Sequence, residues 1–179
     1  SLSLPYAQNI VDLLVTLGWR ESRQNPVTVR DETVTPLQPM VLANGVVGRR
    51  IVTLSDDSAF TALCLEDQTV GKLVETLYLR ILSRPPEREE QAMYTELLQG
   101  GYDSRMVEGA TLKVPAGVET SAVSWANHLD PEASKIKLEL AELARANDPP
   151  TGRLVADWRE RAEDVIWSLV HSPEFLFIP

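Results

Sequence analysis

Hydrophobic residues recur every three to four positions along much of this chain, a period typical of amphipathic helices. The clearest repeat lies near the C-terminus, in residues 153–170, where the apolar stripe runs through Leu154, Trp158, Val165 and Leu169. Asp157 precedes Arg161 by four residues, which is the favourable order for a helix ion pair. An exposed pair contributes only about 0.3–0.5 kcal/mol, so we expect burial of the tryptophan stripe to decide this helix.

Pro173 ends the C-terminal repeat, because the residue before a proline is disfavoured in helical conformation. Ser172, Pro173 and Glu174 then have the order of an N-cap, a first helical proline and a first-turn acid. An apolar segment follows at residues 175–178. We expect it to fold back on the core, and the alternative is an exposed patch for a partner.

The first half of the chain predicts two helical regions. Residues 2–19 contain an apolar face formed by Ile10, Leu13, Leu14 and Leu17, with Gly18 as a stop. A polar stretch, residues 21–33, predicts an extended connection. Thr35, Pro36 and Gln38 then have the pattern of a capping box with proline at the first helical position. The turn signals at 44–45 and 48 leave two interpretations for residues 35–54, a continuous helix or two pieces, and we favour the continuous helix.

The middle of the chain predicts a tight pair of helices. Residues 69–83 are apolar around most of the helix axis, which indicates a central position. Arg84, Pro85 and Pro86 end this helix, and a second follows with acids in its first turns. Its predicted buried side consists of Met93, Leu97 and Leu98. The short connection predicts an αα corner.

Residues 102–129 form the least regular stretch, and an irregular segment of this length is usually functional or mobile. A further helix is predicted from Asp130 to about Ala146, with Ile136, Leu140 and Leu143 on its apolar face. We therefore predict an all-α fold, an irregular bundle of about six helices with one long irregular loop. We expect residues 1–179 to form a single helical domain, the C-terminal fragment of a larger multidomain protein.

The net charge of −9 argues against nucleic acid and anionic membranes as partners, because both require clustered Lys and Arg. No apolar run reaches the roughly 18 residues of a membrane span. The single cysteine, Cys64, lies in an apolar run, so a buried, inert thiol is favoured over a catalytic one. Known catalytic, phosphate-binding and haem-attachment motifs do not occur. We predict no catalytic residues, no metal site and no cofactor in this fragment, and we lean against an enzyme.

Four residues are the candidate ligand-binding set: Trp125, Asn127, His128 and His171. Trp125 with its polar neighbours could form a platform for carbohydrate, although a tryptophan in the core is the commoner case. A metal site at His128, Asp130 and Glu132 is conceivable, but Asp130 is better explained as a helix cap. His171 falls at a helix end, where the dipole favours a cation, so a structural role is favoured over catalysis.

The acidic bend at residues 55–58 allows two interpretations, a cation site or a helix N-cap. The spacing does not match a calcium-binding loop, so the cap is favoured.

Three motifs together resemble one family. The first is Thr35-Pro36-Leu37-Gln38 with the later Leu42-Ala43-Asn44-Gly45, the second is LYLRILSRPPEREE at residues 77–90, and the third is EDVIWSLVHSPEFLF at residues 163–177. Their order is similar to that in planctomycete-type cytochrome-associated proteins with paired domains of unknown function, specifically the PSD1-like C-terminal domain. His171 and Glu87 depart from the family's usual asparagine and Thr or Ser at these positions, and both departures are compatible with a helix terminus.

The resemblance implies a context and no mechanism. Proteins of this kind are typically exported, so an extracytoplasmic or periplasmic location is the expectation. We expect a domain of unknown function that serves as a non-catalytic structural or interaction module of a large exported protein. Its partners would be upstream domains of its own chain or another protein. The alternative is a ligand-binding (carbohydrate or metal) or hydrolytic contribution from the loop at Trp125–His128.

Overall fold

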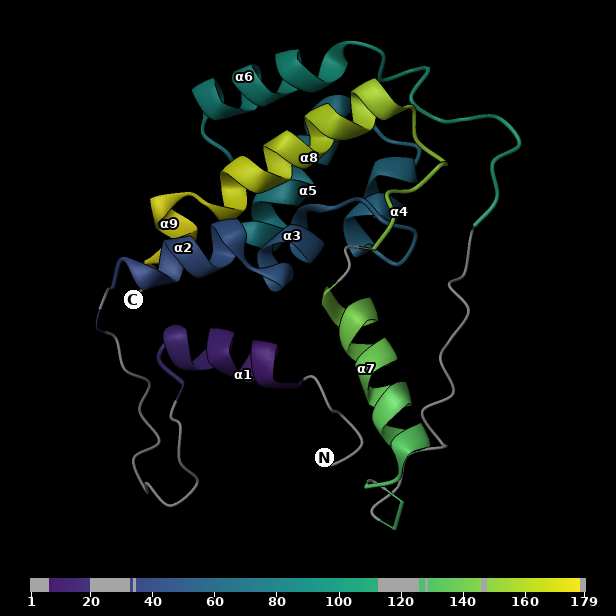
Figure 1. Cartoon of the computed structure of the whole chain (residues 1–179). Coiled ribbons are helices and arrows are strands. Elements are labelled where there is room, and N and C mark those ends of the chain that lie inside the picture. Colours follow the sequence, from purple (N-terminus) through teal and green to yellow (C-terminus); the bar gives the residue numbers. More distant parts are fainter. Residues whose placement is uncertain are drawn as a thin grey trace. The chain divides into compact units, whose positions relative to one another are not determined.

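The computed structural model describes residues 7–19, 33, 35–112, 126–127, 129–145 and 148–177. This part of the chain contains nine helices: α1 (Ala7–Thr16), α2 (Leu37–Asn44), α3 (Val46–Val52), α4 (Ala59–Leu65), α5 (Val70–Ile81), α6 (Arg88–Gln99), α7 (Pro131–Arg145), α8 (Ala156–Val170) and α9 (Pro173–Leu176) (Figure 1). Its only β pairing consists of two isolated bridges, Ser55 with Pro150 and Met106 with Leu154. The predicted all-α fold is confirmed. The described residues contain more helices than the expected six, because three of the nine, α3, α4 and α9, are short.

The chain divides into two compact units. Unit 1 consists of residues 1–50 and 115–147, and unit 2 consists of residues 51–114 and 148–179. The expectation of a single domain over residues 1–179 stays a prediction.

In unit 1, α1 packs against α2. α1 ends at Thr16, and Gly18 follows it as the predicted stop, with a φ of 91° that favours glycine because glycine has no Cβ. Among the residues of α1 whose burial is described, 11–16, Leu13 is buried and Leu14 is exposed. The extended connection predicted for residues 21–33 lies almost entirely outside the described residues.

The predicted capping box and continuous helix over residues 35–54 are both wrong. The helix begins at Leu37 with Pro36 at the N-cap, and the Gln38 amide reaches the Thr33 carbonyl oxygen. Gly45 is extended, with φ −77° and ψ 158°, and it separates α2 from α3. Beyond the break, Gly48 lies so close to α2 that a Cβ there would overlap the backbone carbonyl of Leu42. Glycine therefore permits a backbone approach that a side chain would prevent.

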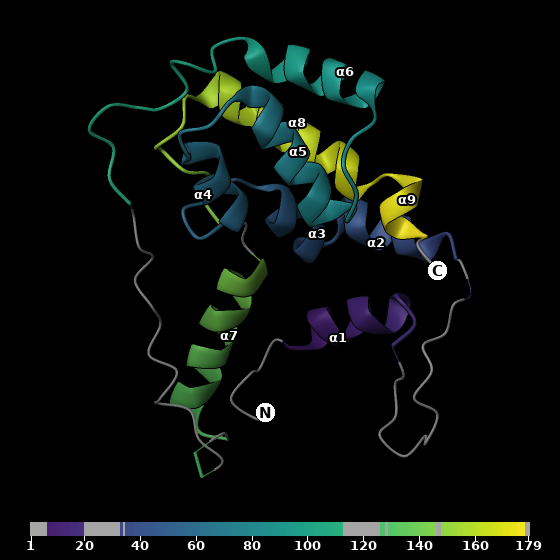
Figure 2. The same cartoon turned by 180° about the vertical axis from the view of Figure 1, so that it is seen from behind.

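Unit 2 has a continuous hydrophobic core around α5 and α8, which contact each other and both contact α6 (Figure 2). The largest side chain in this core is Trp158, which is 1% exposed and donates from Nε1 to the Leu98 carbonyl oxygen at 2.9 Å. The predicted central position of residues 69–83 agrees with the burial of Leu73, Val74 and Leu77. Burying one such side chain contributes roughly 1.5–3 kcal/mol, so this face dominates the local stability.

Side-chain caps fix where several unit 2 helices begin. Ser58 accepts from the Phe60 N–H at the start of α4, which supports the cap interpretation of the acidic bend. Thr69 accepts from Lys72 N–H at the start of α5. Ser172 accepts from Phe175 N–H at the start of α9, with Pro173 at the first helical position as predicted.

Two details of unit 2 differ from expectation. Met93 and Leu97 of α6 are 54% and 42% exposed, and the side chains that reach the core are Leu98 and Tyr94. In the C-terminal segment Phe175 packs on the core as expected, whereas Phe177 is 39% exposed. Within the described residues, no helix combines the length and apolar character of a membrane-spanning segment.

Candidate functional site: a pocket in unit 1 and an aromatic pair in unit 2

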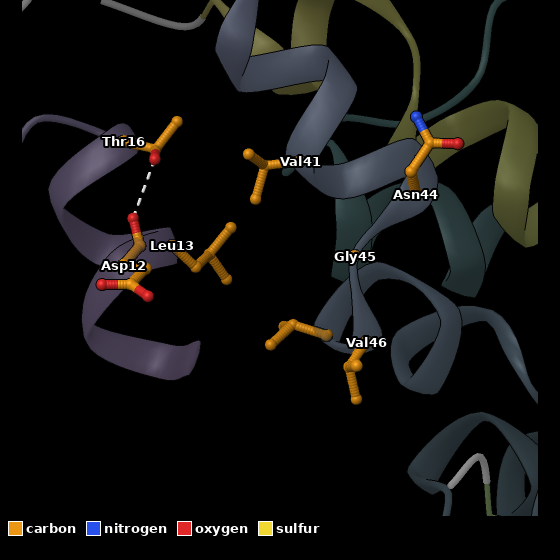
Figure 3. Close-up of a pocket in the computed structure, with 8 residues that line it drawn as sticks. Asp12, Leu13, Thr16, Val41, Asn44, Gly45 and Val46 are labelled. Carbon is orange, nitrogen blue, oxygen red and sulfur yellow. Dashed lines mark hydrogen bonds between the residues drawn. The ribbon is translucent and has the colours of Figure 1, made fainter. Parts of the chain in front are cut away.

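A pocket of about 360 Å³ lies between α1 and the α2–α3 junction in unit 1 (Figure 3). Its wall is apolar on both sides, with Leu13 from α1 facing Val41, Val46 and Val47. Asp12, Thr16, Asn44 and Gly45 complete the lining. Gly45 keeps the junction narrow, because a Cβ there would overlap the Val41 carbonyl oxygen. The volume falls within the range of small-ligand pockets, roughly 300–1,000 Å³.

Two polar side chains of this pocket, those of Thr16 and Asn44, donate to the backbone of their own helices. Thr16 Oγ1 donates to the Asp12 carbonyl oxygen at 2.8 Å (Figure 3). Asn44 Nδ2 donates to the Met40 carbonyl oxygen at 3.1 Å. A hydroxyl that donates to a carbonyl has no general base to activate it as a nucleophile. The apolar walls are therefore suited to holding an apolar group.

Large apolar side chains are also exposed on the outer surfaces of the same helices. Val11 and Leu14 of α1 are 41% and 38% exposed, and Leu37 and Met40 of α2 are 54% and 58% exposed. Trp19, just beyond α1, is 60% exposed. Single exposed hydrophobic residues are ordinary, but a concentration of them on two short helices is typical of an interaction surface.

The predicted ligand-binding residues fall in different parts of the chain. Trp125 and His128 lie outside the described residues. Asn127 occupies the turn before α7 in unit 1, and its carbonyl oxygen accepts from the Asp130 N–H at 2.9 Å. His171 belongs to unit 2. Convergence of these four residues in one site therefore stays a prediction, as does the carbohydrate or metal alternative.

His171 is the C-cap residue of α8 and stacks on Trp167. The ring centroids are 4.3 Å apart with an interplanar angle of 22°. Nδ1 lies 2.7 Å from the Trp167 carbonyl oxygen, so Nδ1 carries the hydrogen. Nε2 is buried and has no hydrogen-bond partner among the described residues. Trp167 itself is 49% exposed, although the other tryptophan of this helix, Trp158, is buried.

Arg105 forms a buried polar cluster that the sequence analysis missed. Its side chain is 4% exposed and donates to the carbonyl oxygens of Cys64 at 2.7 Å, Glu66 at 2.7 Å and Tyr102 at 2.9 Å. The guanidinium lies 3.8 Å from the centroid of the Tyr102 ring. The Cys64 thiol beside it is fully buried, and burial raises its pKa to about 12. The expectation of a buried cysteine is confirmed, and the raised pKa opposes reactivity.

A second arginine, Arg84, joins three segments of unit 2. It donates to both oxygens of Glu90 at 2.8 and 2.9 Å and to both oxygens of Glu174 at 2.6 and 2.7 Å. The hydrogen bonds from Arg84 lower the Glu90 pKa to about 2, and those to Glu174 lower its pKa as well. Burial raises the pKa of Tyr78, whose ring centroid lies 5.4 Å below the Arg84 guanidinium. This cluster holds α9 to the α5–α6 corner.

The acidic bend at residues 55–58 is also tied into the fold. The Asp56 carboxylate accepts from the Thr151 hydroxyl and from Arg153 Nε at 3.0 Å. Within the described residues, no group of three or more His, Cys, Asp and Glu side chains is arranged to hold a metal ion.

Comparison with known proteins places the chain in a family. No curated protein and no solved structure matches it. One family description, PSD1, a protein of unknown function (DUF1553), matches residues 1–98. The match contains α1–α5 and most of α6, and with them the first two motifs of the resemblance, but it ends before the third motif at 163–177. Because this match covers more than half of the chain, the chain belongs to the PSD1 (DUF1553) family.

Proposed function

We propose that this chain is a non-catalytic interaction module of a larger exported protein, and that it binds its partner through the pocket between α1 and the α2–α3 junction. The pocket carries the proposal, because it is open, apolar-walled and surrounded by exposed hydrophobic side chains on the same helices. An apolar anchor that fills a pocket of this kind is the usual centre of a protein–protein interface.

Binding explains the pocket better than catalysis does. The Thr16 hydroxyl donates its hydrogen to the Asp12 carbonyl oxygen, and the Asn44 amide donates one of its two hydrogens to the Met40 carbonyl oxygen. Leu13, Val41, Val46 and Val47 supply apolar surface on opposite walls. Covering such surface removes it from water and contributes about 25 cal/mol per Å².

The partner in this proposal is an upstream domain of the same chain or another protein of the same compartment. The family match supports a domain of unknown function, and the exported location rests on the resemblance described above. A partner segment would insert a leucine-sized side chain into the pocket and also cover the exposed Leu37 and Met40 of α2.

The test uses a variant that fills the pocket without adding charge. Val47→Phe places a ring where the apolar wall is open, and Leu79→Phe adds comparable bulk at an exposed position of α5 in unit 2. Each variant is titrated calorimetrically against the remainder of the full-length protein. We expect Val47→Phe to weaken binding about tenfold or more, since a single methylene in an apolar pocket changes affinity by at least that factor.

Equal affinities for the wild type, Val47→Phe and Leu79→Phe would reject the pocket as the docking site. Turnover by the purified chain that depends on one or two polar residues would reject the non-catalytic assignment. Fractionation of cells that express the tagged full-length protein tests export separately, because retention of the tag in the cytoplasm would overturn the exported location alone.

A further inference from the structure

We propose that the outward face of α8 is a second interaction surface, which binds a lysine- or arginine-containing peptide segment of a partner protein. The aromatic pair Trp167–His171 anchors the cation, and the carboxylates of Asp164 and Glu160 supply the opposite charge. This surface belongs to unit 2 and does not depend on the pocket of unit 1.

The face is defined by helix geometry. At 3.6 residues per turn, Asp157, Glu160, Asp164, Trp167 and His171 form a single stripe along α8. The opposite side of the helix is the core, where Trp158 and Leu169 are 1% and 2% exposed. The stripe therefore points away from the packed interior of unit 2, and three of its five members are acidic.

Trp167 is the residue that core packing does not explain. Half of its surface is open to solvent, although a tryptophan contributes more apolar area to burial than most other side chains. The His171 imidazole stacks on one face of the Trp167 ring, with the ring centroids 4.3 Å apart. The hydrogen bond from His171 Nδ1 to the Trp167 carbonyl oxygen fixes the position of the imidazole. The pair is thus a rigid platform, and tryptophan on a rigid platform is a frequent interface anchor.

The charges on the stripe select the kind of partner. Neither Asp157 nor Asp164 has an ion-pair partner among the described residues, and Glu160 has only a 3.8 Å contact with Arg159. Arg161, the other arginine next to Glu160 in sequence, directs its guanidinium to the carbonyl oxygens of Asp157 and Leu97. The face is consequently negative beside an aromatic ring, a combination that attracts Lys and Arg by charge and by the cation–π interaction.

The test measures binding of fluorescein-labelled hexalysine to the full chain by anisotropy. Hexaglutamate and a neutral glucan hexasaccharide are the matched probes of opposite and zero charge. Trp167→Leu removes the ring, and Phe177→Leu is the control, because Phe177 is also an exposed aromatic residue of unit 2 but lies outside α8. Thermal unfolding of each variant verifies the fold. Asp164→Lys, which reverses charge at an exposed position, gives an independent reading if Trp167→Leu unfolds.

We expect hexalysine to bind the wild type and the Phe177→Leu variant equally, and to bind Trp167→Leu about fivefold more weakly. Asp164→Lys should weaken binding further and flatten its dependence on salt, because the partner charges are screened over roughly 8 Å at physiological ionic strength. Equal binding to wild type and Trp167→Leu would overturn the proposal. Preferential binding of the hexasaccharide, or concentration-dependent dimerisation that is lost in Trp167→Leu, would overturn it in favour of a sugar or a second copy.

Discussion

Replacing Arg105 with methionine should destabilise unit 2 more than any surface substitution. The change removes three hydrogen bonds from a charged donor to the carbonyl oxygens of Cys64, Glu66 and Tyr102. At about 1.5 kcal/mol each, the lower value for bonds to charged groups, these bonds contribute roughly 4.5 kcal/mol. Methionine recovers about 1–2 kcal/mol through burial of its own apolar atoms. The expected net loss is therefore about 3 kcal/mol.

Urea unfolding followed by circular dichroism measures this loss. For a chain of this length, a loss of about 3 kcal/mol corresponds to a decrease in Tm of roughly 6–12 °C. Arg105→Lys keeps the charge but provides one compact donor in place of a planar fork, so it should recover less than half of the lost stability. Arg88→Met, at an exposed position in the first turn of α6, is the matched control and should change stability by less than about 0.5 kcal/mol.

A loss below about 1 kcal/mol in Arg105→Met would refute this reasoning. It would mean that the cost of burying the guanidinium offsets its three hydrogen bonds, as continuum treatments find for many buried charges. Near-UV circular dichroism distinguishes such an offset from a local repacking of the core. The method reports on aromatic side chains, and the guanidinium lies 3.8 Å from the Tyr102 ring centroid and 5.8 Å from the Trp158 ring centroid. Loss of the aromatic signal without loss of stability would indicate local repacking.

Three further outcomes are expected. Because hydrogen bonds from Arg84 lower the pKa of Glu90 to about 2, the stability that Glu90 contributes is complete above about pH 4.5 and is lost as the pH falls toward 2. After allowance for solvent screening this contribution is about 1–2 kcal/mol, so Glu90→Gln should show a flatter dependence of unfolding free energy on pH in that window, and an unchanged slope would contradict the assignment. Gly48→Ala should destabilise unit 1 by about 2 kcal/mol or more in urea unfolding, whereas Gly152→Ala, with open space around it, should be neutral; equal effects would show that the α2–α3 junction can relax. The Cys64 thiol should resist Ellman's reagent at pH 8 in the folded chain and react at once in urea, and rapid labelling without denaturant would show that the core opens locally.

The parts of the fold that could be predicted are those with a strong apolar period and local caps. α5 and α8 have continuous apolar faces. Thr69 marks the start of α5 and Pro173 limits the end of α8, and each of these effects is local in sequence. The break between α2 and α3 did have a local signal in the turn residues at 44–45 and 48, but that signal leaves a continuous helix and two pieces open. The close approach of the Gly48 backbone to the Leu42 carbonyl is a packing feature that no local pattern shows. On α6 the apolar residues were assigned to the core by type, but the helix turns Tyr94 inward and leaves Met93 exposed.

The candidate sites were harder to predict than the fold. Arg105 is buried and donates to backbone carbonyl oxygens, and its cluster contains no acidic side-chain partner. Because every residue has a backbone carbonyl, nothing in the sequence distinguishes this arginine from one on the surface. Trp167 did have a signal: it lies nine residues after Trp158, which places the two rings on opposite sides of one helix. The pocket of unit 1 depends on the packing of α1 against the α2–α3 junction, and residues 12–16 and 41–47 carry no motif that pairs them.

The hydrogen bonds of the buried and half-buried arginines distinguish residues that stabilise the fold from surfaces that are open to a partner. Arg105 donates to backbone carbonyl oxygens, and Arg84 donates to the carboxylates of Glu90 and Glu174 at the α5–α6 corner. Groups bound in this way stabilise the fold, and a substrate would have to displace those bonds before it could use them. The apolar wall around Val47 and the exposed ring of Trp167 have no such internal partner to displace. A partner that covers them removes apolar area from water without breaking an internal bond, and for this reason we assign function to these two surfaces.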